Sequence, residues 1–99
     1  MILKYREWVN KNGYNKKINA TNNCNVAVSR MARRFRELTV QVGYANGIYH
    51  CWLRDNDFNI IDPTKAQFDH PSAIKYELIA ERFLQKHEIE LSTGAIFLD

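Results

Sequence analysis

The chain has 99 residues, a formal net charge of +3 at pH 7 and two cysteines. This length predicts one domain over residues 1–99 with a modest core, and it leaves no room for a separate substrate domain. Two cysteines do not make a secreted disulfide framework, and so small a net charge makes nucleic acid an unfavoured partner. No stretch is apolar enough for a signal peptide or a membrane span, which predicts a cytoplasmic protein with reduced thiols and no membrane contact.

The spacing of apolar residues predicts two helices in the first part of the chain. Residues 2–11 carry apolar side chains three and four positions apart, which is typical of one helix face. Residues 13–23 are polar and rich in asparagine, which favours a loop. A second helix is expected over residues 24–37, so that Cys24 stands at or near its N-terminus.

Three runs typical of strands follow and predict an antiparallel meander. Residues 39–45 and 48–54 alternate between apolar and polar positions, and Asn46-Gly47 between them is the strongest hairpin signal in the chain. A further turn leads to a third strand over residues 58–61. The Asp-Pro pair that comes next ends this strand, because proline cannot donate to the ladder.

Residues 71–87 are expected to form a C-terminal helix, because apolar side chains recur there at helical spacing. The tail over residues 89–99 is expected to form a short strand or an irregular cover over the core. The predicted fold class is therefore α+β, in which a helix bearing Cys24 packs on a small antiparallel sheet and further helices lie at the N- and C-terminal ends.

Cys24, His50 and Asp62 have the residue types and the order of a cysteine catalytic triad. A thiolate attacks a carbonyl, an imidazole transfers the proton, and a carboxylate orients the imidazole. The helix N-terminus favours the thiolate form of Cys24, because the helix dipole lowers the pKa of a cysteine there. If residues 55–57 form the turn between two strands, opposed positions sum to about 112, which pairs His50 with Asp62. Each residue alone has an ordinary structural explanation, but the joint pattern favours a catalytic site.

The alternation of side chains along a strand places His50 and Trp52 on one face and Cys51 on the other. Only one of His50 and Cys51 is therefore expected to face Cys24. Trp52 is expected either to wall the site or to be an ordinary core aromatic. The backbone N–H of Cys24 and one polar side chain would hold an oxyanion. The candidates for that side chain, which loop structure and helix capping also explain, are Asn19, Asn22 and Asn23.

Over residues 20–68 the chain resembles the transglutaminase-like branch of the papain-like cysteine-enzyme superfamily, including its small bacterial and phage members. The residues that carry the resemblance are a cysteine at a helix start, a His-x-Trp strand and an Asp-Pro-Thr strand end: Cys24, His50, Trp52 and Asp62 to Thr64. The resemblance implies a papain-like core and acyl transfer through a Cys24 thioester, with no cofactor and with a protein or peptide as substrate. Members include proteases, transglutaminases, deamidases and peptide-processing enzymes.

Two other interpretations remain open. A small basic protein can keep such a core as a catalytically weak or inactive binding protein, for example a phage protein that binds a host factor. Its docking surface would be an arginine cluster, which is also typical of a solvated helix face: Arg30, Arg33, Arg34 and Arg36. A metal site is disfavoured, because His50 and Cys51 point to opposite faces of their strand and the chain has no Cys-x-x-Cys pair. Its members would be Cys24, His50, Cys51, Asp62 and His70. The oligomeric state and the acyl acceptor are not predicted.

Overall fold

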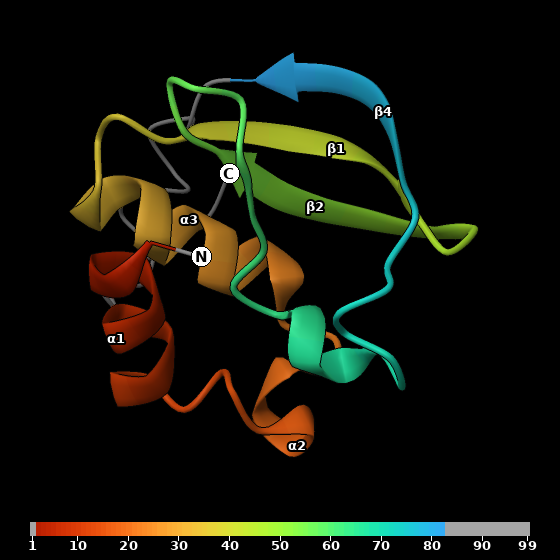
Figure 1. The fold of residues 1–99 in the computed structure, drawn as a ribbon, viewed down its shortest axis with the longest axis horizontal. Coiled ribbons are helices and arrows are strands. Elements are labelled where there is room, and N and C mark those ends of the chain that lie inside the picture. The colour runs from red at the N-terminus through yellow and green to blue at the C-terminus, as the bar shows by residue number, and fades with distance from the viewer. Residues whose placement is uncertain (1, 83–99) are drawn as a thin grey trace, which may run out of the picture.

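Within residues 2–82, four strands form one antiparallel sheet in the order β3-β2-β1-β4, and helix α3 packs against β1 and β2 (Figure 1). The computed structural model describes these residues of the chain. The elements in chain order are α1 (Leu3–Lys11), α2 (Lys17–Ala20), α3 (Cys24–Arg34), β1 (Thr39–Ala45), β2 (Ile48–Arg54), β3 (Ile60–Ile61), a 3-10 turn (Lys65–Gln67) and β4 (Tyr76–Arg82). The predicted α+β class is confirmed at this level.

The core lies between α1, α3 and one face of the sheet. Val40, Cys51 and Leu53 lie on this face, and Val28 and Met31 of α3 belong to the same buried cluster. The apolar positions of α3 fall three and four residues apart, so they share the side of the helix that faces the sheet. Burying an aliphatic side chain of this size contributes roughly 1.5–3 kcal/mol. This packing fixes α3 against β2 and therefore fixes where its first residue lies.

Both predicted N-terminal helices are confirmed, with different ends. α1 lies within the predicted range, whereas the segment expected to be a loop, residues 13–23, contains the short helix α2. α3 ends at Arg34 rather than at residue 37, because Phe35 leaves helical backbone angles (φ −122°, ψ 89°). No helix within residues 2–82 combines the length and the apolar content that crossing a membrane would need.

The predicted hairpin between β1 and β2 is confirmed. Ala45 lies opposite Ile48, and the turn residues Asn46 and Gly47 both have positive φ angles (52° and 78°). A tight two-residue hairpin needs left-handed backbone at both positions, which asparagine and glycine adopt at the lowest cost. The third predicted strand is confirmed only in part, since β3 is limited to residues 60 and 61.

The predicted C-terminal helix is wrong over Tyr76–Arg82, which form β4 along the second edge of β1. The edge of β1 presents backbone N–H and C=O groups that need partners, and pairing with them outweighs the helical spacing of the apolar residues in this segment. The remainder of that predicted helix, residues 83–87, and the predicted tail, residues 89–99, lie outside the described residues.

Gly43 is the point where β4 comes closest to β1. A Cβ atom at this position would lie 2.0 Å from the carbonyl oxygen of Glu77 and 3.0 Å from Cη2 of Trp52. The register of the β1–β4 ladder also shifts between Val42 and Gly43. Glycine inside a strand is typical of such an irregularity or of a close backbone approach, and here both occur together.

Asn46 fixes where β4 begins. Its backbone N–H donates to the carbonyl oxygen of Lys75 (2.9 Å), and its side-chain Oδ1 accepts from the backbone N–H of Lys75 (2.8 Å). Next to this pair of bonds, Tyr76 lies opposite Ala45. Asn46 therefore both forms the hairpin turn and sets where β4, which was expected to be helical, begins to pair with β1.

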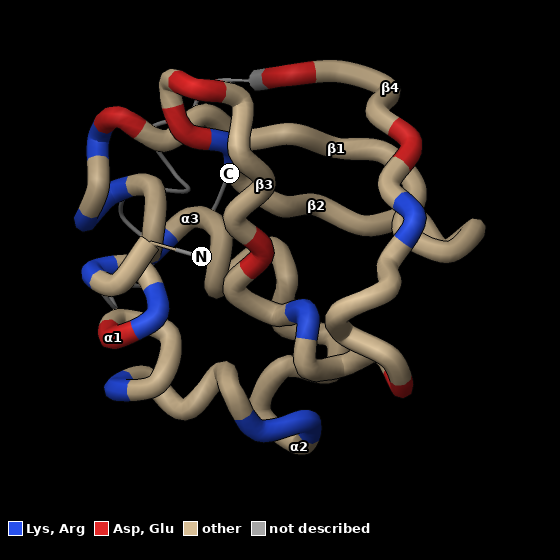
Figure 2. Tube along the Cα trace, viewed as in Figure 1, with Lys and Arg blue, Asp and Glu red and all other residues tan. Residues whose placement is uncertain are grey.

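Many Lys and Arg positions lie along α1 and near the end of α3 (Figure 2). Arg30 is used internally, because its guanidinium donates to the hydroxyl of Tyr14 (2.8 Å) and to Oδ1 of Asn12 (2.7 Å) and lies over the ring of Trp8. The other three members of the arginine cluster are exposed: Arg33, Arg34 and Arg36. The cluster is thus divided between one structural residue and a solvated surface.

Candidate active site

His50 and Asp62 form a buried pair. Nε2 of His50 lies 2.8 Å from Oδ2 of Asp62, and both side chains are almost completely shielded from solvent (0% and 2% exposed). His50 lies within β2, and Asp62 is the first residue after β3. The structure therefore brings together two of the three residues that the sequence predicts for the triad.

The predicted cross-strand register is wrong by two positions. β2 and β3 pair Leu53 with Ile61, so opposed positions sum to 114 (53 + 61) rather than 112. The reason is the turn: the Asp55 backbone N–H donates to the carbonyl oxygen of Asn59, and the Asp55 side chain accepts from two backbone N–H groups of the turn. A shift of two residues preserves side-chain parity, so Asp62 stays on the face of His50 and reaches it diagonally.

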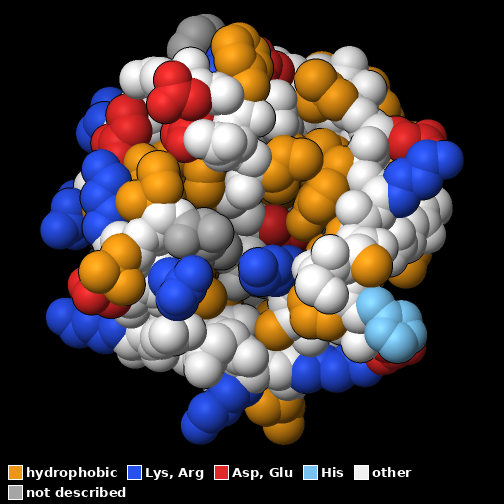
Figure 3. All heavy atoms as spheres, in the orientation of Figure 1, with side chains coloured by type: hydrophobic (Ala, Val, Ile, Leu, Met, Phe, Trp, Pro, Cys, Tyr) orange, Lys and Arg blue, Asp and Glu red, His pale blue; other side chains and the backbone are white. Residues whose placement is uncertain are grey.

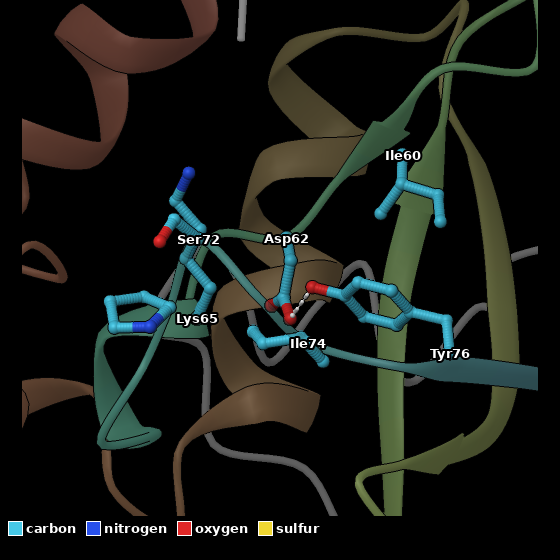
Figure 4. A pocket seen from close by; sticks show the side chains of 7 residues that line it. Ile60, Asp62, Lys65, Ser72, Ile74 and Tyr76 are labelled. Carbon is cyan, nitrogen blue, oxygen red and sulfur yellow. Dashed lines mark hydrogen bonds between the residues drawn. The ribbon is translucent and has the colours of Figure 1, made fainter.

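The Asp62 carboxylate has several donors. Its Oδ1 accepts from the backbone N–H of Thr64 (3.1 Å) and from the Thr64 hydroxyl (3.4 Å). Its Oδ2 accepts from the hydroxyl of Tyr76 (2.9 Å) in addition to His50 (Figure 4). Donors on both oxygens fix the orientation of the carboxylate.

Aromatic rings enclose His50. Trp52 stacks on its ring with centroids 6.0 Å apart, and Phe68 meets it edge-on at 5.2 Å. The indole N–H of Trp52 donates to Oε1 of Gln41 (2.8 Å), which holds the indole in place. The predicted shared face of His50 and Trp52 is confirmed. These rings exclude water from the His50–Asp62 pair, which strengthens the electrostatic interaction between them.

Cys24 is the first residue of α3 and lies half-exposed at the edge of the core. Hydrogen bonding by Cys51 and then by His50 lowers the pKa of the Cys24 thiol from 9.0 to about 4, although burial opposes this. The expectation that only one of these two residues faces Cys24 is therefore wrong. β3 pairs only with Leu53 and Arg54, so the edge of β2 is open beside Cys51, and the Cys24 sulfur also interacts with the Cys51 backbone there.

The His50 imidazole is stabilised in its protonated form. Burial alone would lower its pKa, but hydrogen bonding to Asp62 and then to Cys24 raises the pKa from 6.5 to about 9. Nδ1 of His50 is buried, and no partner within the described residues meets hydrogen-bond geometry with it. Because Nε2 is held by Asp62, Nδ1 is the nitrogen left to exchange a proton with Cys24. A thiolate–imidazolium pair is thus favoured between about pH 4 and pH 9.

The amide groups of the predicted oxyanion donors are used in the segment before α3. Nδ2 of Asn19 donates to the carbonyl oxygen of Gly13 (2.9 Å), and Nδ2 of Asn23 donates to the carbonyl oxygen of Asn19 (2.7 Å). Asn22 occupies a left-handed turn position (φ 63°). The Asn23 side chain makes no capping bond to α3. The first N–H groups of this helix, including that of Cys24, are the remaining oxyanion donors.

Sequence analysis missed four residues that contact the site. Cys51 was expected on the strand face opposite His50, Phe68 was given no role, and Thr64 was noted only within the Asp-Pro-Thr run. A threonine two residues after the aspartate is typical of a turn that satisfies the carboxylate, so this signal was present. Tyr76 was hidden, because the segment that carries it was expected to be helical.

A pocket of about 210 Å³ opens beside the Asp62 carboxylate. Figure 3 shows a hollow on this face of the molecule with an acidic side chain in it and apolar and basic side chains around it. The described lining residues, drawn in Figure 4, are Ile60, Asp62, Lys65, Pro71, Ser72, Ile74 and Tyr76. Cys24 and His50 are not among them. Within residues 2–82 no three His, Cys, Asp or Glu side chains converge as metal ligands.

Comparison of the chain with protein-family models, with curated protein sequences and with solved structures gives no match. The resemblance to the papain-like superfamily therefore depends on the sequence pattern of residues 20–68 alone.

Cys51 is the first cause of the low pKa of Cys24, which leads to a paired prediction. The Cys51 thiol also donates to Oδ1 of Asn25 (3.3 Å); Cys51→Ala removes this thiol and should raise the pKa of Cys24 by more than about one unit. Cys51→Ser keeps a hydroxyl donor and should leave the pKa low. The rate of Cys24 alkylation against pH, followed by intact mass, measures both values. Equal pKa values in the two variants would show that hydrogen bonding from Cys51 does not control the thiol.

Proposed function

We propose that this protein is a cysteine-dependent acyl-transfer enzyme in which Cys24 is the nucleophile, His50 the acid–base and Asp62 the residue that orients His50. The observation that carries the proposal is the buried 2.8 Å contact between His50 and Asp62, together with a Cys24 thiol whose pKa is lowered at the other side of the same imidazole. Perturbed pKa values of opposite direction on neighbouring groups are typical of active sites. In this proposal α3 and the sheet form a papain-like core.

The first half of the reaction forms a thioester. The Cys24 thiolate attacks the carbonyl carbon of a peptide bond or of a glutamine side-chain amide, and the negative charge moves to the carbonyl oxygen. The backbone N–H groups at the start of α3 stabilise that oxyanion, and one such donor is typically worth about 10²–10³ in rate. When the tetrahedral intermediate collapses, Nδ1 of His50 gives its proton to the departing amine or ammonia.

The second half releases the acyl group. Nδ1 of the now neutral His50 takes a proton from water or from an amine, which attacks the thioester carbonyl. Cys24 leaves as a thiolate, and the imidazolium is restored. Water gives hydrolysis or deamidation, and an amine gives transamidation. Asp62 keeps its negative charge throughout and holds the proton on Nε2, so that Nδ1 stays available.

The first test is the pH dependence of Cys24 alkylation by iodoacetamide in the wild type and in His50→Ala. The wild-type thiol should titrate with an apparent pKa near 4. Loss of the imidazole should raise that pKa by more than about one unit and should slow alkylation at neutral pH. Cys51 is buried (2% exposed) and serves as the internal control, since it should react slowly in both proteins.

Alkylation reports the thiolate, so acyl transfer needs its own measurement. p-Nitrophenyl acetate should form an acetyl thioester on Cys24, detected by intact mass and by its sensitivity to hydroxylamine. Its turnover should rise through about pH 4 and fall through about pH 9, because the reactive pair exists between those limits. Thiol reactivity that is independent of His50, with no acetyl enzyme, would overturn the proposal and would favour a binding protein.

A further inference from the structure

Tyr76 has a contact that packing alone does not require. Its ring lies against Trp52, with centroids 4.9 Å apart, and its hydroxyl donates to Oδ2 of Asp62 at 2.9 Å. Nε2 of His50 lies 2.8 Å from the same oxygen, so an imidazole and a phenol share one carboxylate oxygen. Figure 4 shows the bond from Tyr76. Tyr76 also lines the pocket beside Asp62, and it comes from β4, at the opposite edge of the sheet from β3.

We propose that Tyr76 is a positioning residue of the site, whose hydroxyl shares Oδ2 of Asp62 with His50 and so fixes the carboxylate that holds the imidazole tautomer. This inference rests on the proposed function of Cys24, His50 and Asp62. Tyr76 contacts neither Cys24 nor His50 in the described hydrogen-bond network, and it acts through Asp62.

Two physical effects follow from the shared oxygen. The hydroxyl restricts rotation of the carboxylate, because Thr64 holds Oδ1 and Tyr76 holds Oδ2. The hydroxyl also withdraws electron density from Oδ2, which makes Asp62 a weaker acceptor for the His50 proton. Burial and the Asp62 charge in turn raise the pKa of Tyr76, so the phenol keeps its proton and remains a donor across the working pH range.

Tyr76 links the hydrogen bonds of the proposed active site to the pairing of β4 with β1. Tyr76 is the first residue of that strand and lies opposite Ala45 of β1. His50 and Asp62 come from β2 and from the end of β3. The Tyr76 hydroxyl, which also donates to Asp62, is placed by the pairing of β4 with β1. A chain in which β4 is displaced should therefore retain Cys24, His50 and Asp62 and yet hold the imidazole less well.

The test compares Tyr76→Phe with the wild type by NMR titration of the His50 ring nitrogens. Phenylalanine keeps the ring against Trp52 and removes only the hydroxyl. The pKa of His50 should rise by about half a unit to one unit, because Asp62 becomes a stronger acceptor for the Nε2 proton when the hydroxyl is removed. Turnover of p-nitrophenyl acetate should fall by about three- to tenfold. Tyr49→Phe is the matched control, because Tyr49 is exposed and pairs with Tyr44 on the other face of the sheet.

Two further measurements distinguish failure of the Tyr76 inference from failure of the proposed function. If Tyr76 acts through Asp62, Tyr76→Phe in an Asp62→Asn background should leave the His50 pKa unchanged. A His50 pKa equal to that of the wild type in the single variant would overturn the inference while the low pKa of wild-type Cys24 still stands. An ordinary Cys24 pKa in the wild type would instead overturn the proposed function. Should Tyr76→Phe fail to fold, Tyr76→Met, which also lacks the hydroxyl, supplies the same titration.

Discussion

Asp62→Ala should lower the free energy of unfolding by about 3–5 kcal/mol at pH 6, because it removes the carboxylate that is hydrogen-bonded to a buried imidazolium. The Thr64 and Tyr76 donors would lose their acceptor as well. Urea unfolding followed by circular dichroism measures the change. Asp57→Ala is the control, since Asp57 is an exposed aspartate in the turn before β3 and its replacement should change stability by less than about 0.5 kcal/mol.

The loss of stability caused by Asp62→Ala should become smaller at high pH. In the folded wild type the pKa of His50 is about 9, against 6.5 for an ordinary histidine. The folded state therefore holds an extra proton, and this contributes up to about 3 kcal/mol, fully below pH 6.5 and lost as the pH rises through 9. The difference between wild type and variant should thus shrink above pH 9. A difference that is constant from pH 6 to pH 10 would contradict an ionic role for this pair.

Gly43→Ala should destabilise the protein by about 3 kcal/mol or more, which is large for the addition of one methyl group. The new Cβ would lie 2.0 Å from the carbonyl oxygen of Glu77, so β4 must move away from β1. Hydrogen exchange should then speed up selectively in β4, and the loss of the Tyr76 contact should reduce acyl transfer. Urea unfolding and amide exchange together measure these effects.

Gly47→Ala is the matched control for Gly43→Ala. Nothing lies within 4 Å of a Cβ at Gly47, but its φ of 78° disfavours any side chain. Its cost should be about 1 kcal/mol, from backbone strain alone, and exchange in β4 should stay slow. Equal losses in the two variants would mean that the close approach of Glu77 to Gly43 has little energetic weight.

The sequence predicted the members of the candidate site better than their surroundings. Cys24, His50 and Asp62 stand where local patterns are strong: a helix start, an alternating strand and a strand end. The observed register differs from the predicted one by two positions, which is one full period of side-chain alternation along a strand. The prediction that His50 and Asp62 share a face was therefore unaffected by the register of the turn at Asp55. Short-range patterns of this kind are encoded by neighbouring residues, so they can be read from one chain.

The predictions that were wrong concern contacts between segments that lie far apart in the chain. β4 pairs with β1 across more than thirty intervening residues on average, as in the pair Val42 and Ala80, and its apolar spacing also fits a helix. Cys51 was assigned away from Cys24 because alternation describes the faces of a strand and not its edge. Gly43 was the available signal, since glycine in a strand often marks the close approach of another backbone.

The two bonds between Asn46 and Lys75 fix the start of β4 independently of the loop that precedes it. They set the position of Tyr76 from the hairpin side, so the length of the connection that precedes Lys75 does not determine it. Residues 70–73 of that connection are exposed, and two of them, Pro71 and Ser72, line the pocket beside Asp62. Insertions and exchanges there can remodel the pocket wall while the His50–Asp62–Tyr76 geometry stays constant, which makes this connection a natural region for evolutionary diversification.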